Sequence, residues 1–404
     1  MTPLYIDPGT GSMLFSILIG AAATLYFLAR ALIIRAKVFF SGGRASAGNV
    51  QPYVIYSEGK QYWSVFKPIL DEFERRGIDL VYYCAAGDDP VFGEGYRHIK
   101  AEAIGEGNRA FARLNFLSAD FVLMTTPGLD VYQLKRSKSV KHYSHINHSP
   151  TDLVFYHMFG IDYFDSILLS GSYQEKELRE LEALRRLPAR ELVTAGCTYL
   201  DVFAERLKEI PDEGERPFTV LVSPSWGASG LLSCYGKRLL DPLVKTGMRI
   251  IIRPHPQSVK SEAALLEELA KRYGGDKNVS WDYERDNLYS LKKADIMITD
   301  FSGIIFDYIF LRDRPVLYVN QSFDFRPYDA WFISGKTWQF SAMEEFGIEL
   351  REEFFETIGD VIKSASDSPA LKAARRRARE TAWQYRGEAG KRAADYMISV
   401  VNRA

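Results

Sequence analysis

The chain has few cysteines and almost no net charge. Its 404 residues include only Cys84, Cys197 and Cys234, which are widely spaced and odd in number. This spacing excludes a disulfide framework and a structural zinc pattern, and it suits a reducing cytosol. Because 51 basic side chains balance 52 acidic ones, the composition gives no support for bulk binding of nucleic acid.

Repeats and low-complexity tracts are also absent from the sequence, which has a globular composition. Hydrophobic residues make up 47% and charged residues 25% of the chain, and this balance excludes a disordered protein. A chain of this length exceeds one ordinary hydrophobic core. We therefore expect two folded domains, at residues 51–212 and 213–404.

Charged residues are missing from residues 8–29, of which residues 13–28 are mostly apolar. A helix of that length just spans a hydrocarbon core of about 30 Å. Basic residues follow the apolar run directly, at Arg30, Arg35 and Lys37. The positive-inside rule then predicts a single-pass anchor over residues 1–40, with the body on the cytoplasmic side of the inner membrane.

A cleaved signal peptide is the alternative interpretation of this segment. Such a peptide carries its basic residues before the apolar run, whereas here they follow it. The next segment, residues 41–50, is rich in glycine, serine and alanine. It predicts a flexible linker between the anchor and the body.

Short apolar runs alternate with amphipathic stretches throughout the body. Strands are predicted at residues 53–56, 78–85, 121–125, 166–169, 191–195, 219–222, 248–252 and 296–299, and helices at 62–76, 108–117, 173–187, 237–245 and 262–273. This alternation predicts an α/β fold with two Rossmann-like, doubly wound parallel sheets that face a cleft. Ligands of such sheets bind at the carboxyl ends of the strands.

One stretch, residues 294–319, predicts a strand, a tight loop, a helix and a second strand. Thr299 ends the first strand, and Asp300 or Ser302 is placed to cap a helix that begins near Gly303. Free backbone amides at such a helix start bind phosphate well. A plain capped turn between strand and helix is the alternative.

Two further loops follow predicted strands in the same half. In RPHPQS, two prolines fix the backbone around His255, and Arg253 adds positive charge suited to a phosphate. In SPSWG, Ser225 supplies a hydroxyl group and Trp226 an aromatic face that could stack on a base or wall the cleft. A stiff turn and a simple strand–helix turn are the respective alternatives.

Three of the six histidines, His142, His145 and His148, lie in the segment KHYSHINHSPTD. Their spacing suggests metal ligands, but the Ser-Pro dipeptide breaks the pattern and no structural zinc spacing fits. We favour His148 as a general base oriented by Asp152. Asp165 or Asp201 could serve instead as the orienting carboxylate.

Six motifs together resemble the CDP-glycerol glycerophosphotransferase family, which builds polyol-phosphate polymers of bacterial walls. They are HSPTD, FDSILLSGSYQ, GCTYLD, SPSWG, RPHPQS and ITDFSGIIFDY, in this order between residues 115 and 319. The resemblance implies a two-domain fold like that of glycosyltransferase B (GT-B) enzymes, with an inverting transfer that needs no metal or cofactor. Residues 51–212 would form the acceptor-side domain and residues 213–404 the CDP-alcohol-binding domain, which carries the C-terminal helices.

The resemblance also implies roles for single residues. His148 would be the base for the acceptor hydroxyl, and His255 would contact the donor diphosphate. The loop from Thr299 to Gly303 would hold phosphate, and Asp307 would contact the nucleotide or only pack. The first motif differs from the tryptophan-histidine-glycine run of polymerase members, so both the alcohol and the product stay open.

We therefore expect a membrane-associated transferase that moves a phosphoalcohol group from a CDP-alcohol to a lipid-linked or envelope glycan hydroxyl and releases CMP. A basic helix at residues 371–391 would contact anionic lipid or be only a solvated face. A nucleotide-sugar glycosyltransferase or epimerase with the same fold is one alternative. A non-catalytic membrane-tethered scaffold is the other.

Overall fold

The computed structural model divides into two compact units, Met1–Val50 and Gln51–Ala404. The structure describes residues 24–26, 29, 50–212, 214–320 and 323–403. Most of the predicted membrane anchor and linker therefore lies outside the described residues. Among the residues described, every helix is too short or too polar to cross a bilayer.

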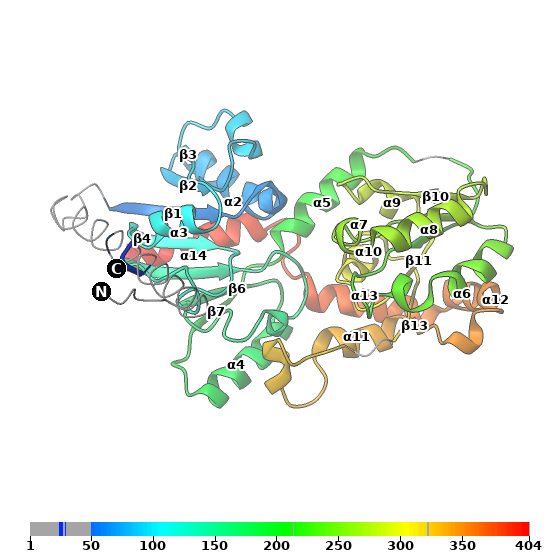
Figure 1. Ribbon diagram of the computed structural model, residues 1–404. Helices are drawn as coiled ribbons and strands as arrows, with labels where there is room; N and C mark the ends of the chain where they lie inside the picture. The colour runs from blue at the N-terminus through cyan, green and yellow to red at the C-terminus, as the bar shows by residue number, and fades with distance from the viewer. Residues whose placement is uncertain (1–23, 27–28, 30–49, 213, 321–322, 404) are drawn as a thin grey trace, which may run out of the picture. The chain divides into compact units, whose positions relative to one another are not determined.

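The second unit, shown in Figure 1, contains two parallel sheets. The first has the strand order β3-β2-β1-β4-β5-β6-β7. Its strands are β1 (Gln51–Ser57), β2 (Leu80–Cys84), β3 (Ile99–Ala103), β4 (Ser118–Met124), β5 (Ser139–Ile146), β6 (Ser166–Leu169) and β7 (Glu191–Thr194). Its connecting helices are α2 (Trp63–Arg76), α3 (Asn108–Leu114) and α4 (Tyr173–Arg185). Successive β1 side chains enter different cores, because side chains alternate between the two faces of a strand.

The second sheet has the order β10-β9-β8-β11-β12-β13. Its strands are β8 (Thr219–Val222), β9 (Arg249–Ile252), β10 (Val279–Trp281), β11 (Ile296–Thr299), β12 (Val316–Tyr318) and β13 (Ile348–Glu349). The helices are α6 (Leu231–Lys245), α7 (Ser258–Ser261), α8 (Ala263–Tyr273), α9 (Leu288–Lys293), α10 (Ile304–Arg312), α11 (Trp338–Phe346) and α12 (Ile358–Asp367). β8 and β11 are fully buried, as expected for strands covered on both faces.

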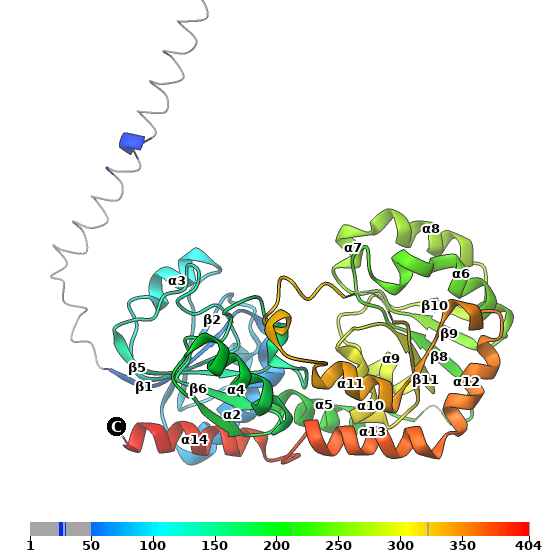
Figure 2. The same ribbon diagram turned by 90° about the horizontal axis from the view of Figure 1, so that it is seen from below.

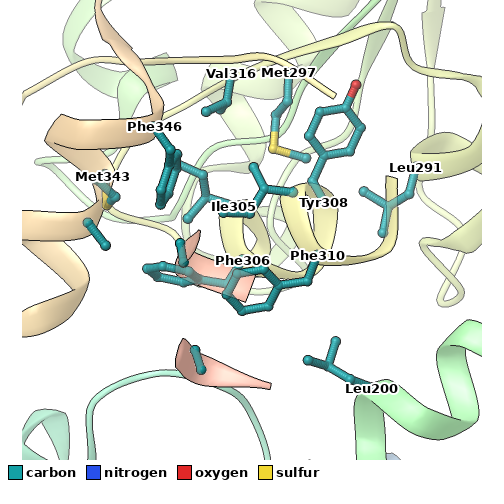
Figure 3. Packing of buried hydrophobic residues seen from close by; sticks show 14 of the residues in the cluster. Leu200, Leu291, Met297, Ile305, Phe306, Tyr308, Phe310, Val316, Met343 and Phe346 are labelled. Atoms are coloured by element: carbon teal, nitrogen blue, oxygen red, sulfur yellow. The ribbon is translucent and has the colours of Figure 1, made fainter. Parts of the chain in front are cut away.

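Helix α10 is the centre of the second domain's larger core. Its aromatic and aliphatic side chains pack against β11, β12, α9 and α11, as Figure 3 shows around Phe306 and Phe310. Leu200 of α5 (Thr198–Glu209) joins the same core. Helix α5 also packs on α2 of the first domain. It therefore contacts both domains.

The C-terminal helices differ from the predicted single helix at residues 371–391. The chain instead forms α13 (Pro369–Ala382) and α14 (Ala389–Arg403). Asp201 explains the break, because its carboxylate accepts hydrogen bonds from the Trp383 indole at 2.8 Å and from the Ala389 amide at 3.2 Å. The second bond satisfies an amide at the start of α14.

Helix α14 also corrects the assignment of all C-terminal helices to the second domain. Figure 2 shows α13 and α14 in succession, and α14 packs on α2 and β4 of the first domain. Only one arginine of the basic cluster in α13 is withdrawn from lipid, since Arg376 and Arg377 are exposed. Arg375 is buried beside Asp313, which also pairs with Arg376.

We predict that Gly390→Ala destabilises the protein by about 1–3 kcal/mol through overpacking. A Cβ atom at this position of α14 would lie 2.6 Å from both the Cβ and the carbonyl oxygen of Pro68 in α2. Urea unfolding measures the change. Gly93→Ala is the control, because its Cβ would meet nothing within 4 Å. An equal unfolding midpoint for the two variants would show that this close approach is unimportant.

Candidate functional site

The predicted site residues of the second domain lie in loops at one edge of the sheet. These loops follow β8, β9 and β11, three adjacent parallel strands. The connections from β8 and β11 leave in opposite directions in the strand order, so their carboxyl ends form the topological switch point where doubly wound folds bind ligands.

Asp300 joins two of these loops and is completely buried. Its carboxylate accepts hydrogen bonds from the amides of Ser225 at 2.9 Å, Leu231 at 2.9 Å and Ser302 at 3.1 Å. Burial raises the pKa of this carboxyl group above its ordinary value. The structure therefore makes Asp300 a support for the loops rather than a direct ligand for substrate.

The start of α10 retains free hydrogen-bond donors. The amides of Gly303 and Ile304 have no partner among the residues that the structure describes. Thr299 is buried, and its hydroxyl donates to the Ser223 carbonyl at 2.6 Å, which ties β11 to the loop after β8. Phosphate can therefore be held by the two amides and the half-buried Ser302, while Thr299 is structural.

His255 and Trp226 are brought together from neighbouring loops, with ring centroids 6.3 Å apart. The Gln257 amide donates to His255 Nδ1 at 3.1 Å, so in the neutral ring the proton is on Nε2. Burial lowers the pKa of this imidazole. His255 thus presents an N–H donor, and the half-exposed Trp226 indole lies beside it.

Arg253 corrects one prediction. Its guanidinium donates to Asp282 at 2.5 Å and to the Glu284 carbonyl at 2.7 Å, and only 7% of the residue is exposed. The sequence suggested a phosphate ligand, but both terminal nitrogens of the guanidinium donate to protein partners and the residue is buried. Arg253 instead fixes the loop after β10 to the end of β9.

His148 follows β5 in the first domain and lines a cavity of about 440 Å³. Glu58, which follows β1, and Thr125, which follows β4, line the same cavity. Burial raises the pKa of Glu58 and lowers that of His148. The Thr125 hydroxyl is buried and has no partner in the described residues. A neutral imidazole, a carboxyl group and a free hydroxyl therefore share one polar cavity.

Asp152 does not orient His148, which is the second correction. The imidazole Nδ1 instead lies 3.3 Å from the Tyr156 hydroxyl. Asp152 accepts the Gln339 amide at 2.8 Å, and Glu177 accepts the Trp338 amide at 3.1 Å. Both carboxyl groups thus accept backbone amides at the start of α11, which have no partner within the helix.

Asp307 also has a structural partner. Asp307 accepts a hydrogen bond from the Tyr199 hydroxyl at 2.7 Å, and burial raises the pKa of Asp307 to about 7.

His142 and His145 lie in a strand, so their odd spacing places them on opposite faces. These two rings therefore cannot share one metal ion, and the described residues contain no cluster able to hold one.

The loop before α10 in the second domain meets the loop that carries His148 in the first domain at Gly303. A Cβ atom added there would lie 3.3 Å from the Thr151 methyl group, in the loop that carries His148. The free amides of α10 are therefore next to the loop of the candidate base.

Glu58 and Tyr156 were not predicted from the sequence as site residues. Glu58 could have been found from its position directly after the first predicted strand, since the switch-point strands of a doubly wound sheet carry ligand-binding loops. Tyr156 lies in no recognised motif, and only the folded loop brings it to the histidines.

Residues 236–399 match the model of the family described as CDP-Glycerol:Poly(glycerophosphate) glycerophosphotransferase. No curated protein sequence matches the chain.

Solved structures with low sequence identity share the fold. The wall teichoic acid polymerase TagF is 14% identical with a TM-score of 0.57, and the match covers 95% of this chain and 98% of that one. The UDP-GlcNAc 2-epimerase from Methanocaldococcus jannaschii is 13% identical with a TM-score of 0.56, covering 86% and 100%. The predicted two-domain, GT-B-like α/β fold is confirmed by the likeness to TagF and the two parallel sheets.

We predict that the contribution of Asp152 and Glu177 to stability falls as the pH rises from about 4 towards about 7. Burial raises the pKa of Asp152 and Glu177 well above the ordinary values of 3.8 and 4.5. The folded state therefore keeps protons that the unfolded state releases in this range. Asp152→Asn, which keeps the oxygen that accepts the Gln339 amide, should reduce the loss by roughly 1–3 kcal/mol.

Urea unfolding at several pH values measures this dependence. Asp367→Asn is the control, because Asp367 is exposed at the end of α12. The same pH dependence in wild type and Asp152→Asn would contradict the prediction.

Proposed function

Because residues 236–399 match the model of the CDP-glycerol:poly(glycerophosphate) glycerophosphotransferase family, we propose that the chain belongs to this family and moves a glycerophosphate-like group from a CDP-alcohol to an acceptor hydroxyl. The observation that carries this proposal is the meeting of two loops. The free amides at the start of α10 lie beside the loop of His148, a neutral imidazole that lines a polar cavity. A phosphate-binding helix start and a base are the two groups that such a transfer requires.

The donor would bind at the second domain. Its diphosphate oxygens would accept hydrogen bonds from the amides of Gly303 and Ile304 and from Nε2–H of His255. Trp226, beside His255, offers a face to the nucleoside or to the alcohol. These donors are fixed by the loop contacts described above, so their dipoles are oriented before the substrate arrives.

The acceptor would bind at the first domain, in the cavity beside His148. Glu58 and Thr125 are polar groups suited to a hydroxyl-rich molecule, because a carboxylate accepts and a hydroxyl both donates and accepts hydrogen bonds. One acceptor hydroxyl would lie against His148 Nε2.

The reaction would then proceed by displacement at phosphorus. His148 Nε2 takes the proton of the acceptor hydroxyl as the acceptor oxygen bonds to the β-phosphorus. The bond from that phosphorus to the bridging oxygen breaks, and CMP leaves with the electron pair. The α10 amides and His255 neutralise the growing charge on the phosphate oxygens, and positioning with electrostatics provides most of the rate gain.

We further propose that residues 13–28 anchor the protein in the inner membrane with the catalytic body on the cytoplasmic side. The apolar run and the basic residues that follow it support this proposal. A lipid-linked or envelope glycan acceptor at the inner leaflet would fit that location.

The first prediction from this function is CMP release from CDP-glycerol by the full chain, in the presence of a membrane lipid extract. His148→Ala should lower the rate about 10²–10⁴-fold because the general base is lost. His255→Ala should lower it about 10²–10³-fold because one oxyanion donor is lost. Nucleotide chromatography measures the product.

His98→Ala is the matched control, since this half-exposed histidine pairs with Asp79 away from the site loops. Turnover by His148→Ala near that of the control would remove His148 as the base. UDP or GDP release from a panel of nucleotide sugars, without CMP release, would move the protein to glycosyl transfer. Activity retained without either histidine would refute the donor and base assignments.

The second prediction concerns the anchor. Leu18→Arg places a charge near the middle of the apolar run, which costs about 2.5–3.5 kcal/mol on insertion scales. The variant should move from the membrane to the soluble fraction after cell lysis, whereas Ala29→Arg, at the end of the run beside Arg30, should stay with the membrane. Equal fractionation of the two variants would exclude a spanning helix here.

A further inference from the structure

The Tyr156 hydroxyl has three polar neighbours in the first domain. His145 Nε2 is 3.2 Å away, His148 Nδ1 is 3.3 Å away and Asn147 Oδ1 is 3.4 Å away. A phenol has one proton to donate and can accept two hydrogen bonds. The three neighbours therefore use its full hydrogen-bonding capacity, and the remaining question is which neighbour receives the proton.

The side-chain amide of Asn147 has a fixed orientation, which bears on where the Tyr156 proton points. Its Nδ2 donates to the Thr151 carbonyl at 3.0 Å, and its Oδ1 accepts the Ser149 amide at 3.4 Å. The atom facing Tyr156 is therefore an oxygen that can only accept. Only a Tyr156 proton that points to Asn147 makes all three contacts hydrogen bonds, and the phenol oxygen then accepts from both histidines.

His145 fits this assignment. The residue is completely buried, and its Nδ1 has no partner among the described residues. A buried N–H without an acceptor is rarer in native structures than an unpaired acceptor. The proton of neutral His145 therefore belongs on Nε2, where it donates to Tyr156. Burial keeps this ring neutral by lowering its pKa to about 3.

We propose that Tyr156, oriented by Asn147, is a positioning residue that holds neutral His148 with its proton on Nδ1. This tautomer leaves the lone pair on Nε2, the atom that must accept a proton from the acceptor. The opposite tautomer would present an N–H there and could not act as a base. The catalytic use of the lone pair rests on the proposed function, whereas the tautomer is a property of the protein without substrate.

Nitrogen NMR of the full-length, ¹⁵N-labelled protein tests the tautomer directly. Long-range proton–nitrogen correlations distinguish a protonated from an unprotonated ring nitrogen, and the missing signals of His148→Ala assign the residue. We expect a protonated Nδ1 and an unprotonated Nε2 in the wild type. A proton on Nε2 in the wild type would overturn the proposal, whatever the activity.

Two variants test the cause. Tyr156→Phe removes the acceptor for Nδ1–H, and Asn147→Ala frees the Tyr156 proton to turn to His148 Nδ1. Both should move the His148 proton to Nε2, and both should lower kcat about 10–10²-fold while KM for CDP-glycerol changes little, because one or two hydrogen bonds are at stake. Tyr163→Phe, at an exposed tyrosine of the same domain, is the control and should change neither tautomer nor kcat.

The outcomes separate this proposal from the proposed function. Folded variants, judged by their near-ultraviolet circular dichroism, that keep the wild-type tautomer would refute the role of Tyr156 and Asn147. A tautomer change in both variants with a parallel loss of CMP release supports both proposals. The expected tautomers in a protein that never releases CMP would support the positioning role and refute the proposed function.

Discussion

The burial of one carboxylate organises the second domain's site. Asp300 gathers amides from the loop after β8, the start of α6 and its own loop after β11. Because those three amides are satisfied internally, the next amides along the chain, at the start of α10, are the ones left for a ligand. The Asp300 carboxylate therefore orders the loops of the anion site without contacting the anion itself. The cost of burying a carboxyl group is offset by three hydrogen bonds that hold the loops in place.

Buried carboxyl groups also connect the two domains. Asp152 and Glu177 come from the first domain and accept amides at the start of α11 in the second, while Tyr199 reaches Asp307 on α10. Asp152 and Asp307, two of these groups, lie in sequence motifs that suggested a catalytic or ligand-binding role. In this protein several motif residues hold loops together. Catalysis and binding are left to the few polar groups that keep a free hydrogen-bond donor or acceptor.

Local patterns predicted much of the fold but not the partners of the charged groups. The strand at β11, the helix after it and the position of His255 followed from buried apolar runs and prolines, which act on neighbouring residues. Strand β5 was missed, because its polar and histidine residues do not form the short apolar run that marks the other strands. Arg253 and Asp152 were assigned wrongly because their partners are distant in sequence, at Asp282 and Gln339. Tertiary partners of this kind are invisible to a local pattern.

The return of α14 to the first domain has a consequence for synthesis of the chain. Met397 and neighbouring side chains of α14 complete the core that α2 and β1 begin. Because α14 follows the second domain in the chain, the first domain cannot close its core until the second has been synthesised. The apolar face of α2 therefore stays uncovered while the second domain is made. Folding of the first domain is thus tied to synthesis of the second, although the first begins earlier in the chain.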